Sequence, residues 1–215
     1  MLIEMKVKQF IDEVDSKSPA PGGGSVAALS ASLGVSLVRM VGHLTMDKKR
    51  FLALDSTIQY EFKDVISSLL YIKDQLIQAI DEDTESFNKI MAAFQMPKIS
   101  DDEKEKRHEK IQEATVGAIL VPMKVATLSL SALHQMPLII KYGNPQTISD
   151  LGVAILSLAS GALGACMNVY INLPGLDDDI AKVQYKAQVD DLKAKINLTQ
   201  AELLEEVYKV LKINE

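Results

Sequence analysis

The feature that most constrains the fold is a long segment without proline or glycine, from Phe51 to Met96. Proline and glycine interrupt helices and strands most often, so their absence favours one very long helix, or two helices joined near Leu70 to Lys73. Pro97 then ends the segment. Alternating apolar and polar runs, which a half-buried strand would show, are almost absent from the sequence. We therefore predict an all-α protein.

Two helices are expected before this segment. An amphipathic helix is predicted over roughly Ile3 to Val14, and a helix of small and apolar residues from about Gly23 to Leu44. The stretch SPAPGGG lies between them and predicts a tight turn, because proline and glycine favour turn conformations.

Three more helices are expected beyond the long segment. The charged run SDDEKEKRHEK opens the first, which Pro122 should kink because proline removes a backbone hydrogen bond inside a helix. After the loop KYGNPQ, Thr147 and Asp150 form a capping-box pattern that opens an uncharged helix. The pair Pro174-Gly175 stops that helix, and the remainder to Ile213 has the pattern of an amphipathic helix.

Long helices with short connections predict one domain over residues 1–215, folded as an antiparallel bundle. Alanine, serine and glycine recur through both apolar helices, which lets helix backbones approach closely. Few large side chains are then left to close off a surface, and this composition favours self-association.

The uncharged segment Leu151 to Leu173 is long enough to span a bilayer. Its flanks are acidic, at Asp150 and at Asp177 to Asp179, and Asn168 and Asn172 lie near one end. A helix that is apolar all round must be buried somewhere. We predict a central helix surrounded by other helices, and no membrane partner.

Charge and cysteine content limit the partners and the compartment. The formal charge is −6 and the pI is near 5.2, so the chain lacks the basic field that nucleic acid requires. The single cysteine, Cys166, cannot form an intramolecular disulfide, and the N-terminus carries acidic residues where a signal peptide needs an apolar run. These features predict a cytoplasmic protein.

Three consecutive glycines, Gly22 to Gly24, stand at the start of the small-residue helix and are followed by Ser25. Glycine in a helix costs about 1 kcal/mol relative to alanine, so a triplet implies a use for bare backbone. Close helix packing is one use. Binding of an anion or a polar ring edge by exposed N–H groups is the other, and the residues alone do not separate the two. The Gly-Lys-Ser/Thr sequel of a nucleotide-hydrolase phosphate loop is missing.

Asp83 lies on a stripe that is predicted to face inward. The stripe has helical spacing and consists of Ile77, Ile80, Thr84, Phe87, Met91 and Phe94, whereas Glu82 and Glu85 fall away from it. An interior carboxylate has its ionised form disfavoured, which raises its pKa toward the range useful for proton transfer. By spacing alone a structural role, in an ion pair or a helix cap, is favoured over a catalytic one.

Other polar residues have two interpretations each. Lys48 and Lys49 follow the small-residue helix, where cations complement the helix dipole, and the same cations suit an anionic ligand tail. Asn168 and Asn172 share a helical face, where amides either hold a polar ring or bridge to a neighbouring helix.

No metal site is predicted. Carboxylate-bridged metal sites in helical bundles need two Glu-x-x-His motifs, and only Glu105 to His108 fits, in a segment charged on every side. His43 and His134 have no acid or cysteine near them in sequence, and both are interpreted as structural.

Together, several segments resemble the formiminotetrahydrofolate cyclodeaminase family, which also includes bacterial methenyltetrahydrofolate cyclohydrolases. The segments that carry the resemblance are SPAPGGGSVAAL, LT followed by KK at Lys48-Lys49, DEDTESFNKIMAAFQMPK, GNPQTISDLGVA and NVYINL. They occur in order along nearly the whole chain.

The resemblance implies an all-α homodimer that binds a reduced folate between helices and needs no metal or other cofactor. It implies a catalytic role for Asp83, which reverses the interpretation from spacing alone. It also implies folate contacts from a set of pocket residues: Gly22, Gly23, Gly24, Ser25, Lys48, Lys49, Gly143, Asn144 and Asp150. Asn168 and Asn172 are added to the predicted folate contacts because of their shared helical face.

The resemblance leaves the reaction open. The first expectation is the ammonia-releasing cyclodeaminase reaction on 5-formiminotetrahydrofolate, and the alternative is the cyclohydrolase reaction that gives 10-formyltetrahydrofolate. A helical scaffold without turnover is a third possibility from another functional class.

Overall fold

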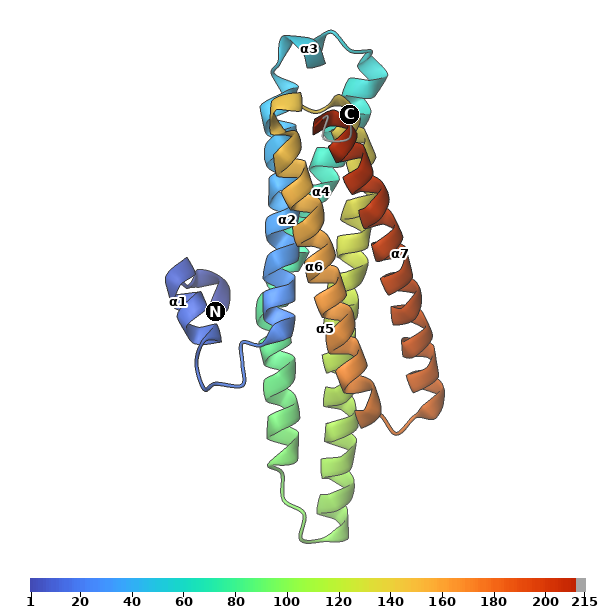
Figure 1. Cartoon of the computed structure of the whole chain (residues 1–215). Helices are drawn as coiled ribbons and strands as arrows, with labels where there is room; N and C mark the ends of the chain where they lie inside the picture. The colour runs from blue at the N-terminus through green and yellow to red at the C-terminus, as the bar shows by residue number, and fades with distance from the viewer. Residues whose placement is uncertain (212–215) are drawn as a thin grey trace.

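The structure is a computed structural model that describes residues 1–211. Within this range the chain is helical and contains no strand, which confirms the all-α prediction (Figure 1). The helices are α1 (Val7–Val14), α2 (Gly23–Met46), α3 (Lys49–Leu52), α4 (Ser56–Phe94), α5 (Asp101–Tyr142), α6 (Ile148–Asn172) and α7 (Asp179–Leu211). A 3₁₀ turn, η1 (Leu2–Glu4), precedes α1, and two more lie between helices: η2 (Pro145–Thr147) between α5 and α6, and η3 (Leu173–Gly175) between α6 and α7.

The long segment is one helix of 39 residues, α4, preceded by the short α3. The break lies before Asp55 and not near Leu70 to Lys73. The Asp55 carboxylate accepts a hydrogen bond from the backbone N–H of Thr57 at 2.7 Å and so caps the first turn of α4. A cap is a local signal that the absence of proline and glycine does not reveal.

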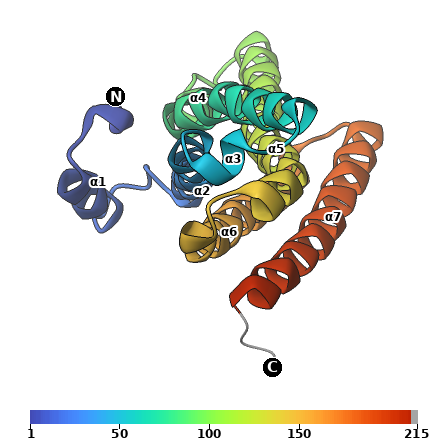
Figure 2. The same cartoon turned by 90° about the horizontal axis from the view of Figure 1, so that it is seen from above.

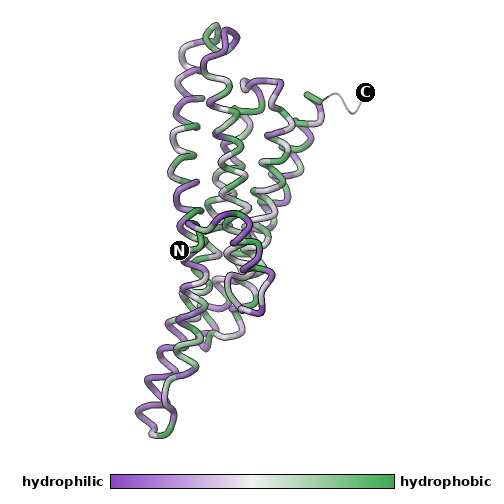
Figure 3. Tube along the Cα trace, turned by 90° about the vertical axis from the view of Figure 1, so that its left-hand side faces the viewer, coloured by the Kyte–Doolittle hydropathy of each residue, from purple (hydrophilic) through white to green (hydrophobic). Residues whose placement is uncertain are grey.

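Helix α5 has 42 residues and continues through Pro122 and Pro137. Its start is fixed by a capping box, in which the Ser100 hydroxyl accepts from the Glu103 N–H at 3.2 Å and the Glu103 carboxylate accepts from the Ser100 N–H at 3.0 Å. Together with α4 it forms a long hairpin whose tip projects beyond the other helices, and much of that tip is hydrophilic (Figures 1 and 3).

The capping box predicted at Thr147 is wrong. Thr147 precedes α6, but its hydroxyl donates to the Asn144 carbonyl at 2.8 Å instead of capping the helix. The side chain is used to close the η2 turn, so it is turned away from the N–H groups of α6. Helix α6 ends at Asn172, just before Pro174-Gly175 as predicted, and Ile213 lies outside the described residues.

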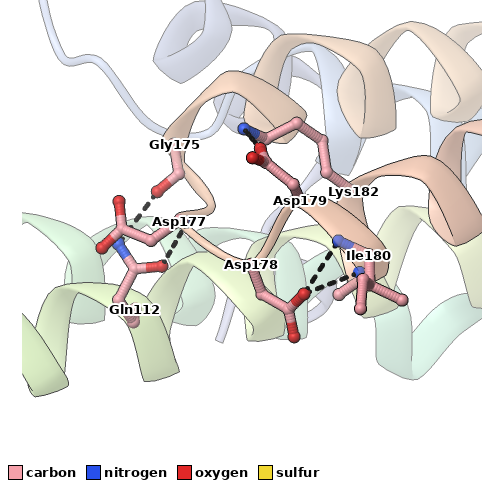
Figure 4. A network of polar contacts seen from close by, with 8 residues as sticks. Gln112, Gly175, Asp177, Asp178, Asp179, Ile180 and Lys182 are labelled. Atoms are coloured by element: carbon pink, nitrogen blue, oxygen red, sulfur yellow. Dashed lines mark hydrogen bonds and ion pairs between the residues drawn. The ribbon is translucent and has the colours of Figure 1, made fainter.

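The connection between α6 and α7 is fastened to α5 by polar contacts (Figure 4). The Gln112 side chain donates to the Gly175 carbonyl at 3.1 Å and accepts from the Asp177 N–H at 2.9 Å. The Asp178 carboxylate then caps α7 by accepting from the N–H groups of Ile180 and Ala181, at 2.9 and 3.0 Å. These bonds fix where α7 turns back along the bundle.

Helices α2 and α6 lie against each other with very small residues between them. A Cβ atom on Gly161 of α6 would lie 2.5 Å from the Ala27 carbonyl oxygen and 2.8 Å from the Ala31 nitrogen of α2. A Cβ on Gly34 of α2 would lie 2.9 Å from the Ala154 carbonyl oxygen of α6. The backbones therefore approach as closely as they do only because these positions are glycine.

Replacing Gly161 by alanine should destabilise the fold. The added methyl meets backbone atoms of α2, which cannot rotate away as a side chain would, so the two helices must separate. Overpacking of this kind costs about 1–3 kcal/mol, which corresponds to a Tm lower by roughly 2–12 °C in a chain of this size. Thermal unfolding followed by circular dichroism measures the change, and an unaltered Tm would show that the contact relaxes without cost.

The prediction that α6 is a central, surrounded helix is wrong. One side of α6 packs on α2, α5 and α7, but Val153, Leu156, Met167 and Ile171 on its other side are between 48 and 75% exposed. Seen from above, α2 and α6 form an outer layer of the bundle (Figure 2). Three helical segments are long and apolar enough to cross a membrane by length and composition alone: residues 23–46, 101–142 and 145–175.

Candidate active site

The start of α2 lies against the middle of α4, and there Gly24 meets Asp83. A Cβ atom on Gly24 would overlap the Asp83 carboxylate, so only glycine leaves room for this side chain. Gly22 is the extended N-cap residue, and Gly23 opens the helix. The structure therefore joins the two sequence features that stood out separately, the glycine triplet and the interior carboxylate.

A buried hydroxyl links the two helices beside this contact. Ser25 is fully buried, and its Oγ lies 2.8 Å from the Ile80 carbonyl oxygen and 3.2 Å from Asp83 Oδ2. It also lies 3.2 Å from Thr84 Oγ1. A serine hydroxyl carries one proton, so the carbonyl and the carboxylate compete for it, and Thr84 can supply a second proton to the group.

The surroundings of Asp83 raise its pKa. Burial among apolar side chains disfavours the ionised form and is the largest effect, whereas the hydroxyl and backbone N–H of Ser25 favour the ionised form and oppose it. The balance shifts the pKa of Asp83 above its ordinary value of 3.8. A carboxyl group in this state can hold a proton and release it nearer to neutral pH.

The raised pKa predicts a pH-dependent difference in stability between the wild type and Asp83→Asn. An acid with a raised folded-state pKa destabilises the fold only when it is ionised there, so the penalty is absent below 3.8 and complete above the raised value. The Tm of the wild type should therefore fall relative to that of the variant as the pH rises from about 4 to 7. Thermal unfolding of both proteins across this range tests the sign, and a constant difference would contradict it.

Helix α6 adds two amides to the same end of the bundle. A Cβ on Gly23 would lie 3.5 Å from Asn168 Nδ2, so this amide lies over the start of α2. Asn168 donates to the Gly164 carbonyl at 2.9 Å. Asn172 donates to the Ala118 carbonyl of α5 at 3.1 Å, which confirms a bridge to a neighbouring helix for that residue.

A pocket of about 530 Å³ opens one helical turn beyond Asp83, between α4 and α5. Ser86, on the same face of α4 as Asp83, lines it together with Lys89, Lys110 and Gly117. A Cβ on Gly117 would meet nothing within 4 Å, so this side of the pocket is open. No local pattern in the sequence predicts these residues, although a small residue three positions after Asp83 is a usable signal for Ser86.

The inward stripe predicted on α4 is correct only in part. Ile80 is buried and Phe87 is half-buried, but Met91 and Phe94 are 41 and 50% exposed. The reason is that α4 continues beyond the start of α2 into the projecting hairpin, where no third helix covers it (Figure 1). Glu82 turns away from Gly24 and pairs with Lys124 at 3.2 Å.

The remaining predicted site residues lie at the other end of α2. Lys48, Gly143 and Asn144 line a pocket of about 260 Å³ there, and the Asn144 N–H donates to the Thr45 hydroxyl at 2.9 Å. Lys49 is exposed in α3, and Asp150 is half-buried in the first turn of α6. Helix α2 has 24 residues, so roughly 35 Å separates these residues from Gly24 and Asp83. One chain does not bring the two groups together.

Within residues 1–211 there is no group of three histidine, cysteine or acidic side chains that could hold a metal ion. His108, from the one Glu-x-x-His motif, pairs with Asp177 at 2.7 Å on the surface. The ion pair lies on the solvent-exposed surface of α5, as expected if the Glu-x-x-His motif belongs to a solvated helix.

Comparison with known proteins identifies the family of the chain. The sequence model of the family described as formiminotransferase-cyclodeaminase matches residues 6–191. The chain is 34% identical to the methenyltetrahydrofolate cyclohydrolase of Methylorubrum extorquens over 96% of its own length and 95% of that protein. It is also 34% identical to the formimidoyltransferase-cyclodeaminase of Rattus norvegicus, over 94% of its own length but 37% of that longer protein.

The fold matches a solved structure as well. The crystal structure of formiminotetrahydrofolate cyclodeaminase from Thermotoga maritima superimposes with a TM-score of 0.82, covering 99% of this chain and 98% of that one, at 24% identity. The match extends over all the helices that carry the Asp83 site, and the sequence match covers the residues of that site. The chain belongs to the formiminotransferase-cyclodeaminase family.

Proposed function

We propose that the chain catalyses ring closure of 5-formiminotetrahydrofolate to 5,10-methenyltetrahydrofolate with release of ammonia. The observation that carries the proposal is the Asp83 carboxyl, held against the bare backbone of Gly24 with its pKa raised. Relatives named formimidoyltransferase-cyclodeaminase are 34% identical to this chain over 94% of its length, which is 37% of their own length, and this likeness supports the same proposal.

The reaction requires a proton to move between two nitrogens. N10 of the folate attacks the formimino carbon and forms a new C–N bond, and the bond from that carbon to the departing nitrogen then breaks. Amines leave poorly unless they are protonated, so the departing nitrogen must gain protons while N10 loses one. Asp83 would relay the proton, a role worth about 10²–10⁴ in rate for general acid–base catalysis.

The neighbouring groups would position the folate. The N-terminus of α2 presents N–H groups that suit the polar edge of a pterin, and Asn168 lies beside them. Holding N10 close to the formimino carbon lowers the entropic barrier of the attack. The pocket lined by Ser86 would extend the space available beside Asp83.

A second candidate is hydrolysis of 5,10-methenyltetrahydrofolate to 10-formyltetrahydrofolate. The observation that favours it is the match to the Methylorubrum extorquens protein, which is named as a cyclohydrolase and aligns along 95% of its length. The same carboxyl would then act as a base toward the attacking water, so the two reactions place similar demands on Asp83.

The absorbance of the methenyl chromophore distinguishes the candidates. Appearance of the chromophore from 5-formiminotetrahydrofolate, faster than without enzyme, supports the cyclodeaminase. Loss of the chromophore from supplied methenyl-folate, in a buffer where spontaneous hydrolysis is slow, supports the cyclohydrolase. If the protein shows no turnover of either folate and no thermal shift with millimolar tetrahydrofolate derivatives, both enzyme candidates are rejected and a scaffold is favoured.

A further inference from the structure

Ser25 is a polar residue without exposed surface, and it lies directly beside the proposed acid–base residue. Ser25 is fully buried, whereas Asp83 is half-buried and keeps part of its surface open to solvent. A residue without accessible surface has no atom that a bound folate can contact. The Ser25 hydroxyl is therefore used inside the protein, although the resemblance to the family implies a folate contact for this residue.

Three oxygens from one turn of α4 surround the Ser25 hydroxyl. They are the Ile80 carbonyl oxygen at 2.8 Å, Asp83 Oδ2 at 3.2 Å and Thr84 Oγ1 at 3.2 Å. A carbonyl and an ionised carboxylate only accept hydrogen bonds, so among these three groups Thr84 is the one that can donate to Ser25. The three side chains can therefore form a chain of hydrogen bonds that runs from Thr84 through Ser25 to Asp83.

This chain of hydrogen bonds suits both protonation states of Asp83. When Asp83 is ionised, its charge attracts the Ser25 proton to Oδ2, and Thr84 can donate to Ser25 Oγ. When Asp83 is neutral, the Ser25 proton can turn to the Ile80 carbonyl, and Ser25 Oγ can accept from the protonated carboxyl group. Only hydroxyl hydrogens rotate between the two states, so a proton can be gained and lost without movement of the surrounding side chains.

Asp83 has no ion-pair partner within residues 1–211 that could take over this stabilising role. On α4, Glu82 pairs with Lys124 of α5 at 3.2 Å, and Asp81 accepts from the Leu2 N–H at 2.6 Å. The other charged groups of the packed elements point elsewhere or lie far along their helices: the amino terminus pairs with Glu4, Glu85 is exposed, Lys89 lines the pocket beside Ser86, and Arg39 of α2 and Asp150 of α6 are about four turns or more away. Burial raises the pKa of Asp83, and the opposing effect comes from Ser25.

We propose that Ser25 and Thr84 are positioning residues for Asp83: Thr84 orients the Ser25 hydroxyl, and that hydroxyl holds the carboxylate against Gly24 and stabilises its ionised form. Ser25 itself makes no contact with the folate. The importance of the two hydroxyls for turnover rests on the proposed function, whereas their effect on the ionisation of Asp83 does not.

Ser25→Ala tests the contact to Asp83. The variant loses a donor to the ionised carboxylate, so the pKa of Asp83 should rise further. The limb of the kcat/KM profile that reports Asp83 should move about one pH unit to higher pH, and kcat at neutral pH should fall about tenfold. KM should stay within about twofold, because no folate contact is removed. A raised KM with an unshifted profile would make Ser25 a folate contact and overturn the proposal.

The matched control is Ser32→Ala. Ser32 lies seven residues later on the same side of α2, is also buried, and donates to the Leu29 carbonyl at 2.8 Å instead of to Asp83. Its profile should coincide with that of the wild type. An equal shift in both serine variants would show that loss of any buried hydroxyl from α2 produces the effect, which also contradicts the proposal.

Thr84 is tested by a double-mutant cycle. Thr84→Val keeps the shape of the side chain without the hydroxyl, and it should move the profile in the same direction as Ser25→Ala but by less, whereas Thr84→Ser should restore the wild-type profile. In the Ser25→Ala background, Thr84→Val should cause no further shift, because its effect passes through the missing hydroxyl. Additive shifts would show that Thr84 acts on Asp83 without Ser25.

A measurement without turnover separates this proposal from the proposed function. The ¹³C chemical shift of the Asp83 carboxyl carbon, assigned by its loss in Asp83→Asn, reports the ionisation of Asp83 directly. Its titration midpoint should be higher in Ser25→Ala than in the wild type and unchanged in Ser32→Ala. An equal midpoint in the wild type and Ser25→Ala would overturn the role of Ser25. If the wild type turned over neither folate, the proposed function would fail while this titration would still decide the role of the hydroxyls.

Discussion

Replacing Asp83 by asparagine should lower kcat by about 10²–10⁴ while the protein remains folded. The amide has nearly the shape of the carboxyl group, so it fits the space left by Gly24 and can still bond to Ser25. It cannot carry a proton between N10 and the departing nitrogen. Binding and positioning of the folate remain, so the residual activity should exceed the uncatalysed rate.

The matched control for this variant is Glu82→Gln. Glu82 is the neighbouring carboxylate on α4, but it turns away from Gly24 and pairs with Lys124. Its kcat should stay within about twofold of the wild type, because its carboxylate is directed to Lys124 on α5 and not to the Asp83 site. Stopped-flow or steady-state absorbance of the methenyl chromophore measures both variants. Wild-type turnover by a folded Asp83→Asn would remove Asp83 from the mechanism.

Replacing Gly24 by alanine should reduce kcat by about 10²-fold with little change in stability. The added methyl would occupy the place of the Asp83 carboxylate. That carboxylate is the end of a side chain that can rotate away, so the helices need not separate, in contrast to Gly161→Ala. Alanine also favours the helical state by about 0.4–1 kcal/mol relative to glycine. The expected result is a folded protein with its proton carrier displaced.

Gly152→Ala is the control for this second variant. Gly152 is also a helical glycine, and a Cβ there would lie 3.4 Å from Val207, which is an ordinary contact on the far side of α6 from the site. Its kcat should equal that of the wild type. Equal kcat values for Gly24→Ala and Gly152→Ala would show that the position of the Asp83 carboxylate does not matter for turnover.

The sequence predicted some features of the site well because they depend on local spacing. The helix expected from Gly23 to Leu44 is α2, and Asp83 was correctly placed on the inward side of α4. Both follow from helical periodicity and from the turn SPAPGGG, which act within a few residues. The same reasoning favoured a structural role for Asp83, because no local pattern says which helix end an inward carboxylate will meet.

Other features were decided by contacts between distant segments. The Thr147 side chain does not cap α6 because its hydroxyl donates to the Asn144 carbonyl. The pocket beside Ser86 is formed between α4 and α5, which lie far apart in the sequence. Met91 and Phe94 fit the inward stripe by spacing, but they are exposed because α4 extends beyond the start of α2, the helix that would have covered them. A helical pattern reports which side chains share a face and not whether a neighbour reaches that face.

The sequence by itself determined that this chain is a helical bundle and where its apolar helices begin. It also determined that a glycine-rich turn precedes α2 and that Asp83 faces the interior. The tertiary structure alone decided that Gly24 and Asp83 touch, that Lys48 and Asn144 lie about one helix length away, and that α6 has an uncovered side. The physical reason is range. Helix formation depends on residues three and four apart in the sequence. Whether a side chain is buried, and which residue of another helix it contacts, depends on where the separate helices begin and end in space.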